Sequence, residues 1–315
     1  MGILRAGAAC AGILAAAGVV ETAYFYNRTM KRSNMDVERT MKMAGTDWSQ
    51  YADVLAERKR AMLSRPHQDV YQTSFDGLKL HGTYFPRERE AGERKRLVIC
   101  FHGYTSKGMS DFTGLSDYYI RHGYAMLHPD ARAHGDSEGV YIGFGCLDRK
   151  DALGWIDWVV QNCGEDIEIL LHGISMGAAT VLMASGLSLP PQVKGIVSDC
   201  GFTSPKEVFT HVLKTMYHLP AFPVIQGADL INKKLAGYGM DECNAKREVE
   251  KADRPILFIH GSKDTFVPVE MCHEIYEHCA SPKKKLIVEG AAHGESYFKN
   301  MKAYEEALDE FIRRL

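Results

Sequence analysis

The sequence lacks a strong excess of either charge. Lys and Arg number 38, and Asp and Glu number 40, among its 315 residues, for a formal net charge of −2. Such a balance creates no global field that favours nucleic acid or an acidic surface. Charged residues make up 25% and hydrophobic residues 45% of the chain. These near-average fractions exclude a disordered chain, a collagen and a polytopic membrane protein.

Paired cysteines and nucleotide-binding glycine motifs are missing as well. No two of the eight cysteines are spaced as Cys-x-x-Cys, so we expect reduced thiols and no disulfide scaffold. No P-loop is present, and Gly143-Phe144-Gly145 lacks the preceding strand and the third glycine of a dinucleotide site. On a helix, His273 and His278 would point in different directions, which argues against a zinc site there. We therefore predict neither a cofactor nor a metal.

Long hydrophobic runs are missing except near the N-terminus. Residues 6–20 are all Ala, Gly, Cys, Ile, Leu or Val, and the aromatic residues 24–26 follow them. A helix from Ala6 to Tyr26 would be about 31 Å long, near the hydrocarbon thickness of a bilayer, with the tyrosines at its interface. We therefore expect residues 1–32 to anchor the chain in a membrane. A cleaved signal peptide that exports the protein, and a helix buried in the protein, are the alternatives.

Basic residues flank this run unevenly. Arg28, Lys31 and Arg32 follow it, whereas only Arg5 and the α-amine precede it. This excess on the C-terminal side predicts that the remainder of the chain stays in the cytoplasm.

From residue 67 strands alternate with helices, after a polar stretch (33–66) that predicts a helical linker. A hairpin is expected over 70–85, around the turn Asp76–Gly77. Short apolar runs typical of buried strands follow at 97–101, 124–127, 167–171, 195–198, 256–259 and 285–288. Helical stretches lie between them. This alternation predicts an α/β domain over residues 67–315, with an open, mostly parallel sheet and helices on both faces.

Residues 202–250 interrupt the alternation. Ser204 and Glu207 form a capping box with Pro205 at the first helical position, and an apolar helix face follows. Such an insertion between core strands predicts a small helical cap over the C-terminal edge of the sheet, or alternatively a helix packed on the body of the domain. The residues expected to line an apolar substrate pocket in this cap are Phe209, Leu213, Met216, Tyr217 and Phe222.

A nucleophile is predicted at Ser175. The strand at 167–171 leads through His172 into Gly173-Ile174-Ser175-Met176-Gly177, and an Ala-rich helix begins directly afterwards. This is Gly-x-Ser-x-Gly between a strand and a helix, where the glycines permit a tight turn that exposes the serine oxygen. The helix N-terminus also favours the negative charge that develops when the serine attacks.

A serine nucleophile needs a base, and the base needs an acid that orients it. Asp264 follows the strand at 256–259 and His293 follows the strand at 285–288. Both therefore lie at the C-terminal edge, where an α/β sheet places its functional loops. Asp199, which closes the strand at 195–198, is a rival for the role of the acid.

Acyl transfer also needs backbone donors for the oxyanion. The N–H of Met176, directly after the nucleophile, is one candidate, and the N–H of Tyr104, after the strand at 97–101, is the other. A third loop, residues 130–139, is expected to shape the site without a chemical role for His134.

These motifs resemble those of the α/β-hydrolase superfamily over roughly residues 68–315, especially bacterial serine aminopeptidase-like and carboxylesterase-like hydrolases that begin with an apolar helix. The matching segments are His102-Gly103-Tyr104, Arg132–Ser137, Gly173–Gly177, Phe258–Gly261 with Asp264, and Ala292-His293. Ala133 stands where most relatives have glycine. The resemblance implies the fold and a Ser-His-Asp triad, whereas substrates vary widely on this scaffold.

The sequence thus predicts a serine hydrolase that cleaves a carboxylic ester with a short to medium acyl chain. Ser175 would attack the carbonyl, His293 would carry the proton and Asp264 would hold the imidazolium. A serine aminopeptidase or amidase acting on short peptides is the alternative, with Glu207 as the candidate partner of the substrate amine. A non-catalytic scaffold tethered to a membrane is the alternative from another functional class.

Overall fold

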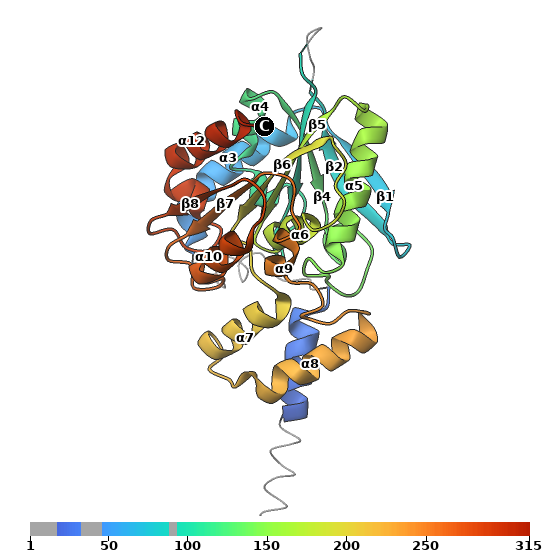
Figure 1. Ribbon diagram of the computed structural model, residues 1–315, viewed down its shortest axis with the longest axis vertical. Coiled ribbons are helices and arrows are strands. Elements are labelled where there is room, and N and C mark those ends of the chain that lie inside the picture. Colours follow the sequence, from blue (N-terminus) through green and yellow to red (C-terminus); the bar gives the residue numbers. More distant parts are fainter. Residues whose placement is uncertain (1–17, 33–45, 88–92) are drawn as a thin grey trace, which may run out of the picture.

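The computed structural model describes residues 18–32, 46–87 and 93–315, and a single sheet organises them. Its strand order is β1-β2-β4-β3-β5-β6-β7-β8. The strands are β1 (Gln68–Thr73), β2 (Lys79–Phe85), β3 (Arg96–Phe101), β4 (Tyr124–Pro129), β5 (Glu168–Ile174), β6 (Val193–Asp199), β7 (Ile256–Gly261) and β8 (Lys283–Val288). β1 and β2 form the predicted hairpin, β2 pairs antiparallel with β4, and the remaining neighbours pair in parallel (Figure 1). The predicted mostly parallel α/β sheet is confirmed.

Side-chain alternation in the central strands divides the core into two layers. In β3, Leu97 and Ile99 join the core on one face of the sheet, whereas Val98 and Cys100 join the core on the other. Successive side chains of a strand point to opposite faces, so a strand covered on both sides has a continuous apolar sequence.

Helices cover both faces of the sheet. They are η1 (Trp48–Tyr51), α3 (Ala52–Leu63), η2 (Ser110–Phe112), α4 (Ser116–Arg121), α5 (Asp148–Cys163), α6 (Met176–Ala184), α7 (Pro205–Thr215), α8 (Ala221–Leu235), α9 (Ala245–Val249), α10 (Val269–His278), α11 (Ser296–Lys299) and α12 (Met301–Ile312). Side chains of α5, α6 and α10 enter the core on one face, and side chains of α3, α4 and α12 enter the core on the other.

The helix predicted before the sheet packs on the domain. It is divided into η1 and α3. Met62 is buried, and the Arg58 guanidinium donates to the carbonyl of Gly114 and to the Tyr297 hydroxyl. The described part of the predicted linker is therefore a surface layer of the body, while residues 33–45 lie outside the described residues.

A cap projects from the body, and we define it as residues 18–32 together with 202–238 (Figure 1). Its helices α7 and α8 pack against each other. His211 of α7 hydrogen bonds to the carbonyl of Thr265 at 2.9 Å, which ties the cap to the loop after β7. α9, near the end of the predicted insertion, instead packs against α6 and α10 in the body.

Residues 18–29 form a helix that contacts both cap helices. Phe25 packs edge-on against Phe209 of α7, with ring centroids 5.6 Å apart, and the Tyr26 hydroxyl donates to Asn232 of α8 at 3.3 Å. Gly227 of α8 permits a close crossing between α8 and the helix of residues 18–29, because a Cβ atom at Gly227 would lie 2.7 Å from Thr22 Cγ2.

This packing corrects part of the membrane prediction. Tyr26 is buried in the protein beside the buried Phe25, so it forms no interfacial belt, whereas Tyr24 is exposed. Among the described residues, no helix is both long and apolar enough to cross a bilayer. The helix of residues 18–29 agrees only in part with the alternative of a helix buried in the protein, because Val19 and Val20 are exposed. Residues 1–17 lie outside the described part, and the anchor, the signal peptide and the cytoplasmic location stay predictions.

Candidate active site

Ser175 occupies a sharp turn between β5 and α6. Its backbone angles are φ 56° and ψ −113°, a conformation that residues with a side chain rarely adopt. Two glycines make the turn possible. A Cβ atom at Gly173 would collide with the carbonyl of Gly177, and a Cβ atom at Gly177 would collide with the carbonyl of Phe101. The backbone N–H of Ser175 donates to the Asp199 carbonyl at 2.8 Å, which fixes the turn to β6.

The structure brings the three predicted triad residues together in one hydrogen-bonded chain. His293 Nε2 lies 2.8 Å from Ser175 Oγ, and His293 Nδ1 lies 2.7 Å from Asp264 Oδ2. With Nδ1–H donating to the carboxylate, Nε2 is free to accept the serine proton. All three side chains are buried, and Ser175 is only 7% exposed.

Asp264 is held as a carboxylate by its surroundings. Its Oδ1 accepts backbone N–H groups of Phe266 and Val267 at 3.0 and 2.9 Å, and its Oδ2 lies 3.3 Å from His260 Nε2. Burial opposes ionisation of this carboxyl, but the His293 and His260 imidazoles outweigh it and hold its pKa below the ordinary value. His260 is a partner of the acid that the sequence analysis did not identify.

Asp199, the rival acid, has a different environment. Its Oδ2 accepts the Tyr304 hydroxyl at 3.0 Å, and the carboxyl is fully buried. Burial raises the pKa of Asp199 to about 6. The hydrogen bond to His293 comes from Asp264, so the geometry favours Asp264 as the acid.

The loop after β3 lies directly against the nucleophile. A Cβ atom at Gly103 would be 3.3 Å from Ser175 Cβ, so the chain passes close to the serine here. Across the described residues, neither the Tyr104 N–H nor the Met176 N–H donates to a protein acceptor. Both predicted oxyanion donors are therefore available to a substrate oxygen. His134 Nε2 accepts the N–H of Thr105 at 3.3 Å and so steadies this loop, and the absence of a chemical role for His134 stays a prediction.

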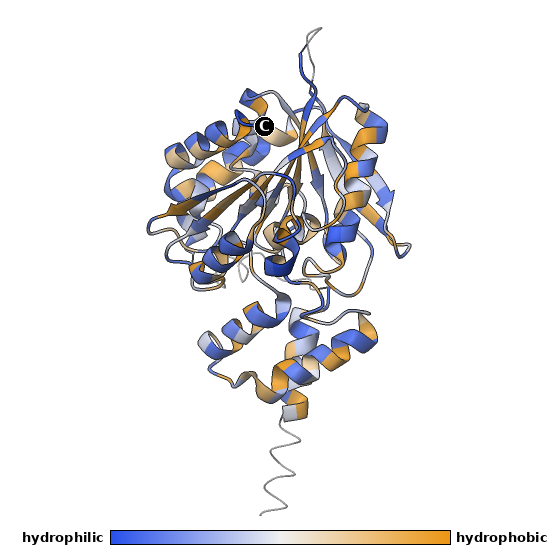
Figure 2. Cartoon of the chain, in the orientation of Figure 1, coloured by the Kyte–Doolittle hydropathy of each residue, from blue (hydrophilic) through white to orange (hydrophobic). Residues whose placement is uncertain are grey.

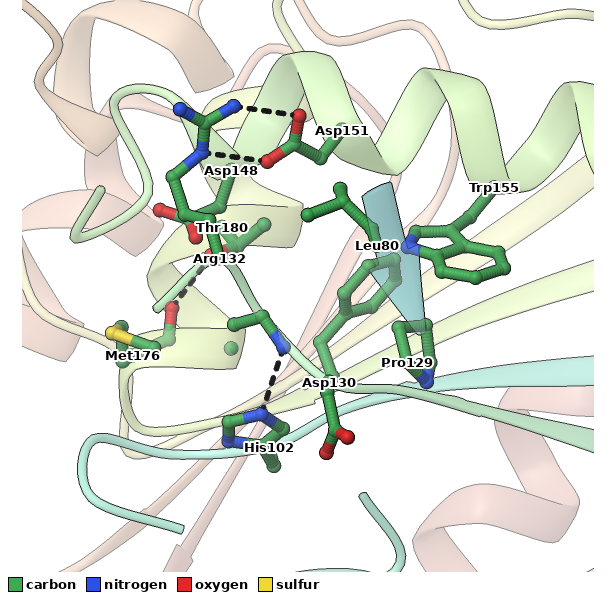
Figure 3. Close-up of a pocket in the computed structure, with 13 residues that line it drawn as sticks. Leu80, His102, Pro129, Asp130, Arg132, Asp148, Asp151, Trp155, Met176 and Thr180 are labelled. Atoms are coloured by element: carbon green, nitrogen blue, oxygen red, sulfur yellow. Dashed lines mark hydrogen bonds and ion pairs between the residues drawn. The ribbon is translucent and has the colours of Figure 1, made fainter. Parts of the chain in front are cut away.

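The loop of residues 130–139 contacts the segment that carries the predicted oxyanion donor Tyr104. Ala131 N–H donates to His102 Nε2 at 3.0 Å, and Arg132 forms two hydrogen bonds to Asp151, at 2.7 and 2.8 Å (Figure 3). These residues, with Met176, line a cavity of about 20 Å³, large enough for one water molecule. The buried ion pair thus fixes the loop beside the oxyanion donors.

Aromatic rings connect the oxyanion loop to the cap. The ring centroids of Tyr104 and Phe144 are 5.3 Å apart, and those of Phe144 and Phe209 are 4.9 Å apart. On the other side of the site, the Phe266 ring lies 5.0 Å from the His293 imidazole. Phe144 and Phe266 were missed by the sequence analysis because neither belongs to a motif. The doublet of glycines around Phe144 and the position of Phe266 two residues after Asp264 are the only signals.

The residues predicted for the cap pocket fall into two groups. Phe209 and Leu213 are buried within the cap, where Phe209 extends the aromatic series. Met216, Tyr217 and Phe222 are exposed, and Phe222, at 72%, is too open to enclose an acyl chain. The prediction is therefore wrong for Phe222, which is exposed at a position near the start of α8 where the backbone is not helical.

Two sets of side chains among the described residues have donor types that metals use. One is Cys200, Asp264 and His293, in which the last two already bond to each other. The other is His81, Asp130 and Asp136, in which His81 Nδ1 bonds to Asp130 at 2.7 Å. The absence of a metal and a cofactor stays a prediction.

A protein-family model described as X-Pro dipeptidyl-peptidase (S15 family) matches residues 15–236. The chain belongs to this family. The S15 match contains Ser175, Tyr104 and Met176 and ends before Asp264 and His293. Together with the fold, it makes the chain a member of a hydrolase family with the α/β-hydrolase architecture.

Individual curated proteins and solved structures are also similar to this chain. The chain is 29% identical over 216 residues to the uncharacterized protein YqkD of Bacillus subtilis, covering 69% of this chain and 70% of that protein. It is 27% identical over 164 residues to the lysophosphatidylserine lipase ABHD12 of Danio rerio, covering 51% and 41%. The solved structure of the Pyrococcus furiosus esterase Pf2001 is similar with a TM-score of 0.64 at 24% identity, covering 80% of this chain and 92% of that one.

Proposed function

We propose that the protein is a serine esterase that acts through an acyl-enzyme. Ser175 Oγ attacks the ester carbonyl while His293 Nε2 takes the serine proton, and the N–H groups of Tyr104 and Met176 bind the oxyanion. Asp264 stabilises the imidazolium, which then returns the proton to the departing alcohol. Water, activated by the same imidazole, hydrolyses the acyl-serine. The observation that carries this proposal is the unbroken hydrogen-bonded chain from Asp264 through His293 to Ser175.

The surroundings of the site favour an apolar substrate. The Phe266 ring lies against His293, and the paired rings of Tyr104 and Phe144 extend from the oxyanion loop. Apolar walls with a few placed polar groups are typical of small-molecule sites. The names of the similar Pyrococcus furiosus esterase and Danio rerio lipase support ester chemistry. The proposed substrate remains a carboxylic ester with a short to medium acyl chain.

A second candidate is the release of X-Pro dipeptides from the N-terminus of peptides, which the description of the family model favours. This activity requires a group that binds the substrate amine. Glu207, the candidate carboxylate, already accepts the Thr203 hydroxyl and pairs with Lys246 at 3.4 Å. A carboxylate engaged in this way is a poor partner for a substrate amine, so the esterase is preferred. A non-catalytic scaffold would have no need of two free oxyanion donors beside a paired serine.

The test is a comparison of ester and amide substrates on purified protein. We expect turnover of 4-nitrophenyl butyrate and labelling by a fluorophosphonate probe, both lost in Ser175→Ala and kept in Ser188→Ala, a variant of an exposed serine away from the site. Faster turnover of Gly-Pro-4-nitroanilide than of any ester would favour the peptidase. An unlabelled Ser175 with no turnover of either class would refute both and favour the scaffold.

A further inference from the structure

Exposed apolar side chains gather on the cap. In the part of the chain that the structure describes, fifteen large apolar side chains are exposed, and eight of these belong to the cap. Six lie on α8 and the helix of residues 18–29, and they are Val19, Val20, Tyr24, Phe222, Leu230 and Leu235. Single exposed apolar residues are normal on a protein surface, but a concentration on one small element marks an interaction site.

Contacts and helical spacing place these side chains on one end of the cap. A Cβ atom at Gly18 would lie 3.3 Å from Pro223 Cγ, so Val19 and Phe222 flank a contact between their two helices. Along α8, Leu230 and Lys234 follow Pro223 at intervals of seven and eleven residues, which places them on one face of the helix, and all three are exposed. Figure 2 shows apolar residues on α8 and on the helix of residues 18–29 in the part of the molecule farthest from the sheet.

The cap also carries an excess of basic residues, although the whole chain has a net charge of −2. Its seven basic residues are Arg28, Lys31, Arg32, Lys206, Lys214, Lys233 and Lys234, against Glu21, Glu207 and Asp229. Arg32 donates to the carbonyl of Ser137 in the body and Lys233 pairs with Asp229 at 2.7 Å, whereas Lys234 is exposed near the end of α8. An apolar surface with an exposed lysine at its edge suits the boundary between headgroups and acyl chains, and the net positive charge of the cap adds attraction to anionic lipids.

The course of the chain favours a bilayer over a second protein as the occupant. Residue 18 enters this end of the cap directly from residues 6–17, which are all Ala, Gly, Cys, Ile or Leu. Residues 6–17 contain no charged side chain that would favour contact with water. The sequence before the cap surface is therefore as apolar as the surface itself.

We propose that this cap surface, formed by Val19, Val20, Tyr24, Phe222 and Leu230 with Lys234 at its edge, docks on a lipid bilayer that contains anionic headgroups. The docking is peripheral, because the helix of residues 18–29 is already held between α7 and α8. The proposal is independent of the reaction at Ser175.

Flotation of the full-length protein with vesicles tests the surface. We expect the double variant Phe222→Ser/Leu230→Ser to bind at least about tenfold more weakly than the unmodified protein. Lys234→Glu should bind several-fold more weakly to vesicles rich in phosphatidylglycerol and equally well to pure phosphatidylcholine. The matched controls are Phe75→Ser and Lys59→Glu, exposed residues of the body that should leave binding unchanged. Thermal unfolding of each variant shows whether it is folded.

A fluorescence measurement separates the cap from residues 1–17. Tryptophan introduced by Phe222→Trp should be quenched by vesicles with brominated acyl chains, whereas tryptophan introduced by Phe75→Trp should not be. Equal flotation of the folded cap variants and the unmodified protein, or absence of quenching at position 222, would overturn the proposal. So would a dimer that Phe222→Ser/Leu230→Ser converts to a monomer, because the surface would then be an interface between two copies.

Discussion

The C-terminal edge of the sheet and the cap are built by different forces. At the edge, hydrogen bonds fix each predicted reactive residue. Two backbone N–H groups donate to the Asp264 carboxylate, and the Thr46 hydroxyl donates to the carbonyl of His293 at 2.8 Å. The N–H of Ser175 donates to the carbonyl of Asp199. In the cap, ring contacts such as Phe25 with Phe209 and a few hydrogen bonds join the helices. Directional bonds fix atoms to within fractions of an ångström, whereas apolar packing fixes mainly volume.

The contrast suggests a division of labour between the two regions. Reaction chemistry depends on the relative positions of a few atoms, so it belongs to the edge. Choice of substrate depends on the shape and polarity of the surrounding walls, so it belongs to the cap and the rings next to it. Mutations at the edge should therefore change rates by orders of magnitude, and mutations in the walls should change preferences by small factors.

The strongest test of the edge is removal of its reactive groups. Ser175→Ala or His293→Ala should each lower kcat by on the order of 10⁴- to 10⁶-fold, because the proton acceptor and the nucleophile act as a unit. For the same reason, the double variant should be little worse than either single variant. Stopped assays with 4-nitrophenyl butyrate measure these rates, and losses that multiply in the double variant would contradict the shared role.

Two carboxylates at the same edge provide the next test. Asp264→Asn should lower kcat on the order of 10⁴-fold, because the amide favours the wrong imidazole tautomer. Asp199→Asn should lower it less than about tenfold, since Asp199 bonds to Tyr304 and not to His293. The reverse ranking of the two variants in the same assay would make Asp199 the acid.

The edge was also the region that the sequence predicted well. Ser175, Asp264 and His293 follow three different strands, and parallel strands bring their carboxyl ends to one edge, so a short motif and the strand order were enough. The existence of β1 to β8 followed from apolar runs and turn residues in the same way.

The cap could not be predicted to the same depth. The packing of Phe25 on Phe209 and of Tyr26 on Asn232 joins segments about two hundred residues apart, and no local pattern encodes such a contact. An apolar run near the N-terminus predicts burial without specifying whether lipid or protein covers it, which is why the belt prediction failed for Tyr26. Phe222 is exposed at a position where the backbone is not helical, and no local pattern in the sequence predicts this interruption of α8.

The pH dependence of stability tests the buried carboxyl of Asp199. Its pKa is about 6 in the folded protein, against about 4 in an unfolded chain. The folded state therefore holds this proton more tightly, so the wild-type free energy of unfolding falls as pH rises from about 4 to 6. Asp199→Asn replaces the carboxyl with an amide that does not titrate, so the variant lacks this fall in the free energy of unfolding. The stability of the variant relative to the wild type should rise over this interval by at most about 3 kcal/mol, measured by urea unfolding at pH 4 and pH 7.5.

A relative stability that is constant with pH would mean that the carboxyl titrates alike in both states. Asp157→Asn is the matched control for the loss of a carboxylate, because the Asp157 side chain is exposed on α5. It is compared with the wild type at the same two pH values.

The smallest expected effect concerns the wall beside His293. The departing alcohol takes its proton from His293, so the Phe266 ring, 5.0 Å from that imidazole, lies on the leaving-group side. Phe266→Ala should lower kcat/KM several-fold for esters of naphthol and leave esters of methanol nearly unchanged, since each buried carbon contributes roughly 0.8 kcal/mol. Tyr71→Ala, which removes an exposed ring from β1, is the control and should change neither. Equal losses of kcat/KM for the esters of both alcohols would instead show that Phe266 positions His293. The same residue would then serve both the reaction chemistry and the choice of substrate.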